Sequence, residues 1–296
     1  MRTLRFGSRK SLLAVAQTRL VMEAIKKRYP EITLELVTME TTGDRNMKPF
    51  SEASDKFGIK GLFTQELEEA LLQGKIDVAV HSLKDMPVHL NPDLPLAAYF
   101  HRGDPRDALV LPAPGTERRE KAAGCSSARR RIQLLRLFPG WTVEPLRGNV
   151  VTRLKKLDEG RYSALVLAAA GLCRLSLENR ISRCFSVSEM IPAPGQGILT
   201  CQTRADAARE SWLDAVRDSE AADCAAAERS FSAALGGGCA APVGAYAEIS
   251  GTEMKLRGFY ADEPAGICAA GVLTGCRAEA RRLGEVLALK LKNERR

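Results

Sequence analysis

A buried strand followed by a polar turn is predicted by the stretch Ile76-Asp77-Val78-Ala79-Val80-His81-Ser82-Leu83-Lys84-Asp85-Met86-Pro87. Its first half is apolar and rich in β-branched residues, as in a strand that a parallel sheet buries on both faces. The run ends in four polar side chains, and Pro87 prevents a helix from following directly. Such a strand has no evident reason to end in polar groups unless they hold something, and ligands of open α/β sheets bind at the carboxyl ends of strands. We therefore expect Lys84 and Asp85 to form the floor of a ligand site.

Strand and helix patterns alternate on both sides of this stretch, which predicts α/β structure. The chain before it predicts a strand at 3–7 and a helix from Leu12 to about Tyr29. A second α/β pattern occupies about 104–190, and irregular segments on both sides of it cross between the two patterns. We therefore expect a hinged pair of α/β lobes with a cleft between them. The segment from about 219 to 296 combines helices with three strands and predicts a C-terminal α+β domain.

Composition places the chain among ordinary globular proteins: it has 296 residues, 45% hydrophobic and 27% charged. No apolar run approaches the roughly 18 residues of a membrane span, and the N-terminus lacks a signal-peptide pattern, so we expect a cytoplasmic protein without a membrane partner. Eight cysteines without a C-x-x-C pair and only three histidines argue against a metal site, and most of the cysteines are expected to be buried. The net charge of +8 favours an anionic partner, which could be nucleic acid, a membrane surface or an acidic small molecule.

Basic residues gather at the turns that are expected to begin helices. In the first lobe such a turn carries Arg9 and the predicted N-cap Ser11. In the second lobe the turns carry Ser127, Arg129, Arg130, Arg147, Gly148, Arg153 and Arg174. Guanidinium groups bind carboxylates and phosphates bidentately and stay charged. Any single arginine is more readily explained as a solvated surface residue, but the set indicates a ligand with several negative groups.

Nucleic acid fits this pattern less well. The arginines are spread over several turns, no nucleic-acid motif is present, and aromatic residues make up only 5% of the chain. We therefore expect a polyanionic small molecule and no nucleic-acid partner.

Asp85 and Cys239 stand out from their surroundings. Asp85 could cap a turn or pair with Lys84, or it could act as an acid or base or stabilise a developing cation. Three consecutive glycines precede Cys239, which indicates a loop that exposes the thiol or admits a bulky group close to it. A lone cysteine is otherwise most often a buried core residue.

Taken together, the motifs resemble the porphobilinogen deaminase, or hydroxymethylbilane synthase, family. The matching stretches run in order along the chain: Gly7-Ser8-Arg9-Lys10-Ser11, Gly58-Ile59-Lys60-Gly61-Leu62-Phe63, Val80-His81-Ser82-Leu83-Lys84-Asp85-Met86-Pro87, Asp104-Pro105-Arg106-Asp107-Ala108, Ser126-Ser127-Ala128-Arg129-Arg130, Leu146-Arg147-Gly148-Asn149-Val150, Leu167-Ala168-Ala169-Ala170-Gly171-Leu172, Pro192-Ala193-Pro194-Gly195-Gln196-Gly197 and Gly237-Gly238-Cys239. Each stretch is modest evidence, but their order and spacing together are highly specific.

The resemblance implies a fold of two hinged α/β lobes, similar to type II periplasmic binding proteins, and a C-terminal α+β domain. The implied boundaries are 1–99 with about 198–216, then 100–197, then 217–296. It also implies a monomeric transferase that joins four porphobilinogen units head to tail and releases ammonia at each step. The product, hydroxymethylbilane, forms on a covalent dipyrromethane primer and is freed by hydrolysis.

The resemblance further implies roles for individual residues. Asp85 would be catalytic, and Cys239 would anchor the dipyrromethane through a thioether. Cofactor contacts would come from Ser82, Lys84, Ser127, Arg129, Arg130, Arg147 and Gly148. Substrate contacts would come from Arg9, Ser11, Lys60, Phe63, Arg147, Arg153, Arg174 and Gln196, with a lid at about 43–63. No metal is implied.

Several positions depart from the family pattern: Cys125 replaces Thr, Ala128 replaces Leu, Val151 replaces Gly or Asp, and Ile59 replaces Gly. None of these changes removes a proposed functional side chain. Two other hypotheses are a non-catalytic two-lobed protein that binds a polyanionic ligand, and a nucleic-acid-binding protein. Neither needs Asp85 or the glycine-rich loop before Cys239, so these two features favour the enzyme.

Overall fold

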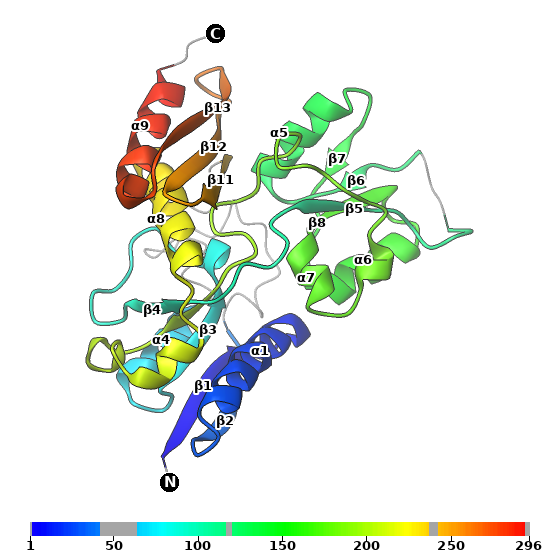
Figure 1. The fold of residues 1–296 in the computed structure, drawn as a ribbon. Helices are drawn as coiled ribbons and strands as arrows, with labels where there is room; N and C mark the ends of the chain where they lie inside the picture. The colour runs from blue at the N-terminus through cyan, green and yellow to red at the C-terminus, as the bar shows by residue number, and fades with distance from the viewer. Residues whose placement is uncertain (1, 42–63, 117–119, 237–241, 294–296) are drawn as a thin grey trace. The chain divides into compact units, whose positions relative to one another are not determined.

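The computed structural model describes residues 2–41, 64–116, 120–236 and 242–293 (Figure 1). The chain divides into two compact units. One contains Met1–Arg102 and Ile198–Asp223, and the other contains Gly103–Gly197 and Cys224–Arg296. Each unit has its own core.

The first unit is an α/β lobe built on a five-stranded sheet in the order β2-β1-β3-β10-β4. Its strands are β1 (Thr3–Arg9), β2 (Thr33–Met39), β3 (Val78–Ser82), β4 (Leu96–Tyr99) and β10 (Leu199–Gln202). β1 is parallel to β2 and β3, whereas β10 is antiparallel to β3 and β4. β3 is buried on both faces as expected, but the sheet is mixed, since the chain enters β10 from the opposite end.

Helices α1 (Leu12–Arg28) and α4 (Gln65–Leu72) belong to this lobe. The Ser11 hydroxyl accepts a hydrogen bond from the amide of Ala14 at 3.3 Å, which confirms the predicted N-cap. Val21 and Ile25 of α1 are fully buried and belong to the core cluster that contains Phe6 and Trp212. Short 3-10 turns follow β3 at Leu83–Asp85 and β10 at Ala205–Ala207 and Ser211–Ala215.

The second unit begins with another α/β lobe, whose sheet has the order β7-β6-β8-β5-β9. Its elements are β5 (Asp107–Val110), β6 (Ala123–Gly124), α5 (Ala128–Leu137), β7 (Val143–Glu144), α6 (Val150–Asp158), β8 (Ala164–Ala168), α7 (Ala169–Cys173), a 3-10 turn (Glu178–Arg180) and β9 (Arg183–Cys184). β6 is parallel to β7 and β8, so these three strands end at the same edge of the sheet. Helices α5, α6 and α7 therefore all begin at that edge.

The C-terminal part is an α+β structure. It contains α8 (Ser219–Ala234), β11 (Val243–Ser250), β12 (Glu253–Asp262), β13 (Ile267–Cys276), a 3-10 turn (Arg277–Glu279) and α9 (Ala280–Lys292), and its strands form an antiparallel meander. Side chains of both helices share one core with the sheet, Phe231 from α8 and Leu287 from α9. The two helices approach closely at Gly284, where a Cβ atom would lie 2.3 Å from the carbonyl oxygen of Ala227. Figure 1 shows α8 and α9 beside this sheet.

This architecture agrees with the fold class expected from the sequence in having two α/β lobes with an added α+β domain. The domain boundaries given above stay a prediction. The expectation that most cysteines are buried is wrong for the described residues. Cys125, Cys201 and Cys224 are buried, Cys173, Cys184 and Cys268 are half-buried, and Cys276 is exposed. No helix in the described part of the chain is long and apolar enough to cross a membrane.

Candidate active site

In the first lobe, the candidate residues lie where two parallel strands end. β1 and β3 are neighbours in register, with Phe6 opposite Val78. Their carboxyl ends therefore meet at one edge of the sheet, which brings Arg9 and the turn with Lys84 and Asp85 to that edge. Ser11 begins α1 just beyond it.

Two of the four polar side chains at the end of β3 have partners inside the lobe. His81 is buried, and its Nε2 atom lies 3.1 Å from Oε1 of Gln202 in β10. The Ser82 hydroxyl lies 3.0 Å from Nε2 of Gln17 in α1. The argument that all four side chains need a ligand is therefore wrong for His81 and Ser82. For Asp85 it stays a prediction.

Burial lowers the pKa of His81 to about 4. The hydrogen bond that His81 donates to Oε1 of Gln202 and the negative charge of Asp85 raise this pKa, whereas the positive charge of Arg9 lowers it further. Near neutral pH the imidazole is uncharged. Arg9 and Asp85 therefore both influence this buried neutral group.

Asp85 is exposed at the end of a firmly held turn. The flanking Leu83 and Met86 are almost fully buried, and the amide of Met86 donates to the carbonyl oxygen of Leu83 at 3.0 Å. Among the described residues, no side chain or amide is hydrogen-bonded to the Asp85 carboxylate. Its backbone is fixed by the apolar neighbours, and its side chain is exposed.

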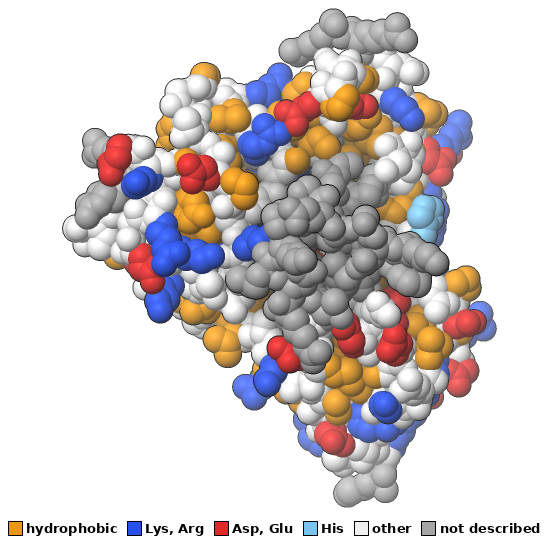
Figure 2. Space-filling view, turned by 180° about the vertical axis from the view of Figure 1, so that it is seen from behind, with side chains coloured by type: hydrophobic (Ala, Val, Ile, Leu, Met, Phe, Trp, Pro, Cys, Tyr) orange, Lys and Arg blue, Asp and Glu red, His pale blue; other side chains and the backbone are white. Residues whose placement is uncertain are grey.

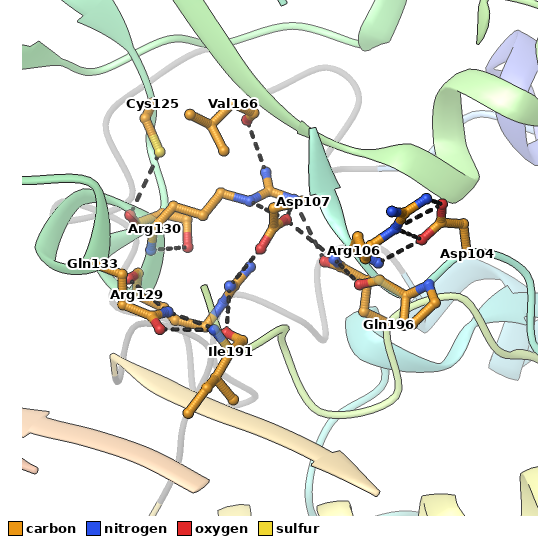
Figure 3. Close-up of polar contacts among 12 residues, drawn as sticks. Asp104, Arg106, Asp107, Cys125, Arg129, Arg130, Gln133, Val166, Ile191 and Gln196 are labelled. Carbon is orange, nitrogen blue, oxygen red and sulfur yellow. Dashed lines mark hydrogen bonds and ion pairs between the residues drawn. The ribbon is translucent and has the colours of Figure 1, made fainter. Parts of the chain in front are cut away.

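In the second lobe, a buried carboxylate joins two arginines (Figure 3). Asp107, at the start of β5, is fully buried, and Arg129 and Arg130 of α5 are 4% and 8% exposed. Nη1 of Arg129 lies 2.7 Å from Oδ2 of Asp107, and Nε of Arg130 lies 2.8 Å from Oδ1. Burial alone would raise the pKa of Asp107, but the two guanidinium charges lower it well below its ordinary value. The three groups keep one positive charge in excess.

Gln196 and Ile191 extend this cluster into the segment that leaves the lobe. Nε2 of Gln196 donates to Oδ1 of Asp107 at 3.1 Å, and its Oε1 accepts from Arg130 at 3.4 Å. Nη1 of Arg129 also donates to the carbonyl oxygen of Ile191 at 2.7 Å. Figure 3 shows that N–H groups of both arginines donate to acceptors within the protein: Asp107, Val166, Ile191 and Gln196. We define Asp107, Arg129, Arg130 and Gln196 as the Asp107 cluster.

The turn between β6 and α5 is linked to the next turn of the sheet. Ser127 caps α5 by accepting a hydrogen bond from the amide of Arg130 at 3.4 Å. The hydroxyl of Ser126 accepts from the amide of Leu146 at 2.8 Å, and Leu146 immediately precedes Arg147. Two candidate turns are therefore joined through a hydroxyl group.

The second of these turns carries Arg147 and Gly148. Nε of Arg153 donates to the carbonyl oxygen of Gly148 at 2.7 Å, and Nζ of Lys156 donates to that of Arg147 at 2.9 Å. Gly148 has a φ of 114°, and a Cβ atom there would lie 2.8 Å from the side chain of Thr152. Only glycine fits this turn, and two cations hold its backbone.

Arg174 is half-buried just beyond α7, which follows β8. Its Nη2 donates to the carbonyl oxygen of Gly197 at 2.5 Å. Burial lowers the pKa of its guanidinium to about 10, so the group is still charged near neutral pH. Figure 2 shows further Lys and Arg side chains on the surface of the lobe formed by 103–197, with acidic side chains among them.

The structure brings the turns with Ser127, Arg147 and Arg174 to one sheet edge, and those with Arg9, Lys84 and Asp85 to one edge of the other lobe. Lys60, Phe63 and Cys239 lie outside the described residues. The sequence interpretation missed the roles of Asp107, Gln17 and Lys156. An acidic residue directly before the apolar run 108–110 was a signal for a buried ion pair, but neither Gln17 nor Lys156 stands out locally. Within the described ranges, no group of three or more His, Cys, Asp or Glu residues could hold a metal ion.

Two family models match the chain. "Porphobilinogen deaminase, dipyromethane cofactor binding domain" matches residues 4–211, and "Porphobilinogen deaminase, C-terminal domain" matches residues 222–293. The porphobilinogen deaminase of Acetivibrio thermocellus is 50% identical, over 97% of this chain and 97% of its own length. That of Ruminiclostridium josui is 46% identical, over 100% of this chain and 99% of its own.

Solved structures that partly resemble this chain include the BenM effector-binding domain with benzoate and the periplasmic aliphatic sulphonate-binding protein SsuA from Escherichia coli. The BenM domain has a TM-score of 0.41 and 13% identity, covering 72% of this chain and 88% of that domain. SsuA has a TM-score of 0.41 and 14% identity, covering 79% of this chain and 70% of its own.

The buried neutral state of His81 predicts a loss of stability in acid. The folded pKa of about 4 lies below the unfolded value of about 6.5, so the unfolded chain binds a proton first as the pH falls. Stability due to this group is complete above about pH 6.5 and is lost progressively down to about pH 4, by up to about 3 kcal/mol. Urea unfolding at pH 7.5 and 4.5 should show a smaller acid loss for His81→Gln. The exposed His89 provides the control: His89→Gln should behave like the unchanged protein, and an equal effect of both variants would contradict the assignment.

Asp107 is expected to dominate the stability of the second lobe. Asp107→Asn leaves two guanidinium groups buried without their counterion, which should cost about 3–5 kcal/mol. The matched control is Asp104→Asn, because Asp104 pairs with the half-exposed Arg106 at 2.7 Å. That change should cost about 1 kcal/mol or less. Urea unfolding of the three proteins provides the comparison, and equal losses in the two variants would show that the Asp107 cluster has no special weight.

Proposed function

The chain belongs to the porphobilinogen deaminase family, and from this we propose that it joins four porphobilinogen units head to tail. Each addition releases ammonia, the chain grows on a covalent dipyrromethane primer, and hydrolysis frees hydroxymethylbilane. The observation that carries the proposal is the match of both family models across residues 4–211 and 222–293. Family membership favours this transferase over a non-catalytic two-lobed binding protein.

The donor set of the second lobe suits a polycarboxylate such as dipyrromethane. Each pyrrole carries an acetate and a propionate group, so a ligand of this kind needs several fixed cations. Two guanidinium groups and one carboxylate are the charged groups of the Asp107 cluster, a set that suits a ligand carboxylate. We propose that dipyrromethane is held by Ser82, Lys84, Ser127, Arg129, Arg130, Arg147 and Gly148.

Substrate carboxylates would be bound by a second group of side chains. It consists of Arg9, Ser11, Lys60, Phe63, Arg147, Arg153, Arg174 and Gln196. Support for the role of Arg174 comes from its partial burial and its retained charge, because a desolvated guanidinium binds a carboxylate more strongly than an exposed one. Lys60 and Phe63 lie outside the described residues, and their inclusion rests on the resemblance alone.

Asp85 is proposed as the catalytic carboxylate. Loss of ammonia from porphobilinogen leaves a positively charged pyrrole, which the surrounding arginines would destabilise. A carboxylate near the pyrrole N–H offsets that charge and can accept and return a proton. The exposure of Asp85 on a turn anchored by Leu83 and Met86 supports this role. When bound, the dipyrromethane primer would supply the pyrrole carbon to which the first unit is joined, and each later unit would join the ring added before it.

We further propose that the protein acts as a monomer in the cytoplasm on a small-molecule substrate. No nucleic-acid or membrane partner is part of this proposal. The scattered placement of the basic turns supports a small polyanionic ligand over nucleic acid.

The covalent primer predicts a mass above that of the polypeptide. Intact mass spectrometry of the purified protein should show the added mass of one dipyrromethane, and acidic Ehrlich's reagent should colour the protein. Cys239→Ser should lose both signals. The exposed Cys276→Ser should keep both. An unmodified mass in active protein would refute the proposed function.

Asp85→Ala should reduce chain elongation by roughly 10²- to 10⁴-fold, the usual contribution of a positioned acid or base. The fold should be unaffected, because the Asp85 side chain is exposed. Product formation can be followed spectroscopically after oxidation to porphyrin. Asp93→Ala, an exposed aspartate of the same lobe, is the control and should retain full activity. Near-normal turnover of Asp85→Ala would remove Asp85 from the mechanism.

A further inference from the structure

A fully buried carboxylate in α8 joins two parts of the second unit. Glu228 is 0% exposed. Its Oε2 accepts a hydrogen bond from the amide of Gly195 at 2.6 Å, and its Oε1 accepts one from the amide of Ala247 in β11 at 2.7 Å. A buried carboxylate is costly unless such donors are present, so these contacts determine where the side chain can lie. Glu228 therefore ties α8 and β11 to the segment around Gly195.

The segment around Gly195 also contacts the Asp107 cluster. Gly195 has a φ of 77°, a conformation that suits glycine, and its amide donates to Glu228. The next residue, Gln196, is 1% exposed, and its side chain donates to Pro105 O at 2.7 Å and to Asp107. Figure 3 shows Gln196 directed at Asp107 and Arg130. Two adjacent residues thus connect Glu228 to the arginine pair.

Glu228 also joins the two described elements that flank Cys239 in the sequence. α8 ends at Ala234 and β11 begins at Val243, and Glu228 lies on the first and is bonded to the second. The contacts run from α8 and β11 through Glu228 to Gly195, and from Gln196 to Asp107 and Arg130. The two elements that precede and follow Cys239 in the sequence, α8 and β11, are therefore linked by hydrogen bonds to the segment that contacts Arg129 and Arg130.

We propose that Glu228 is a positioning residue for the tethered primer. It holds α8 and β11, which precede and follow the stretch with Cys239 in the sequence, in a fixed relation to the Asp107 cluster. This inference rests on the proposed function and adds to it a residue outside the family-derived set. Errors of about 1 Å in such placement can lower a rate by roughly 10²-fold.

The second unit has other contacts that keep it assembled when Glu228 is changed. The amide of Ala245 donates to the carbonyl oxygen of Pro192 at 2.9 Å. Ile191 packs with Phe259 and Ala261 in a separate apolar cluster. A variant of Glu228 should therefore fold while losing the precise register that the carboxylate imposes.

The test compares Glu228→Gln with Ser230→Ala in the full-length protein. A glutamine has nearly the same shape, but its Oε1 can serve only one amide and its NH₂ group faces the other. Ser230 lies on the same helix and donates to the carbonyl oxygen of Arg281 at 2.8 Å, so Ser230→Ala removes a contact that does not involve Gly195. Circular dichroism and thermal unfolding establish that each protein is folded at the assay temperature. Intact mass spectrometry then measures the fraction of protein that carries the primer. The kcat is calculated per molecule of primer-bearing protein, and KM is measured in the same assay.

For folded Glu228→Gln we expect either a loss of the primer adduct or a fall in kcat of roughly ten- to a hundredfold. Ser230→Ala should keep the adduct, kcat and KM even where its melting temperature falls. A Glu228→Gln protein with a full adduct and unchanged kcat, whatever its melting temperature, would overturn the inference.

Glu228→Asp covers the case in which the glutamine variant does not fold. Its carboxylate is one methylene shorter and can hold only one of the two amides at full strength. A folded Glu228→Asp should show a smaller loss of adduct or kcat, and unchanged values would overturn the inference. The unchanged protein separates this question from the proposed function, because absence of a primer adduct there would refute the proposed function itself.

Discussion

The second unit depends on one buried charge arrangement, in which Asp107 lies between Arg129 and Arg130. Two guanidinium groups could not be buried together without a counterion, because desolvation and mutual repulsion would exceed any packing gain. The carboxylate at the start of β5 meets this need and aligns the first turn of α5 with the sheet. Its charged side chains are two guanidinium groups and one carboxylate.

The segment Ile191–Gly197 connects this charge arrangement to the C-terminal part of the chain. Ile191 accepts a hydrogen bond from Arg129, Pro192 accepts one from β11, and Gly195 donates to Glu228. Gly197 accepts a hydrogen bond from Arg174. Backbone groups of this one irregular segment thus form hydrogen bonds with several different elements. They can do so because the carbonyl and amide groups of irregular backbone are not used in the hydrogen bonds of a helix or sheet. The first lobe uses a simpler arrangement, in which Leu83 and Met86 anchor the turn that presents Asp85.

Elements with strong local patterns were predicted well. The strand that begins at Thr3, the helix from Leu12 and its Ser11 cap appear as expected, because their periodicity and capping chemistry lie within a few residues. The edge that gathers the turns of Arg147 and Arg174 was also predictable, since parallel strands end on the same side. The mixed sheet around β3 was not, because the antiparallel partner β10 comes from far along the chain. The same distance hid the bond between His81 and Gln202.

The sequence by itself determined the fold class, the family and the set of basic turns, because these depend on residue type, order and spacing. Only the tertiary structure decided which polar groups are already satisfied within the protein. His81 and Ser82 are hydrogen-bonded to Gln202 and Gln17, respectively, whereas the side chain of Asp85 is exposed on its turn. Glu228 and Gln196 gained their roles in the same way. The physical reason is that burial and hydrogen bonding are set by neighbours in space, which for these groups are remote in sequence.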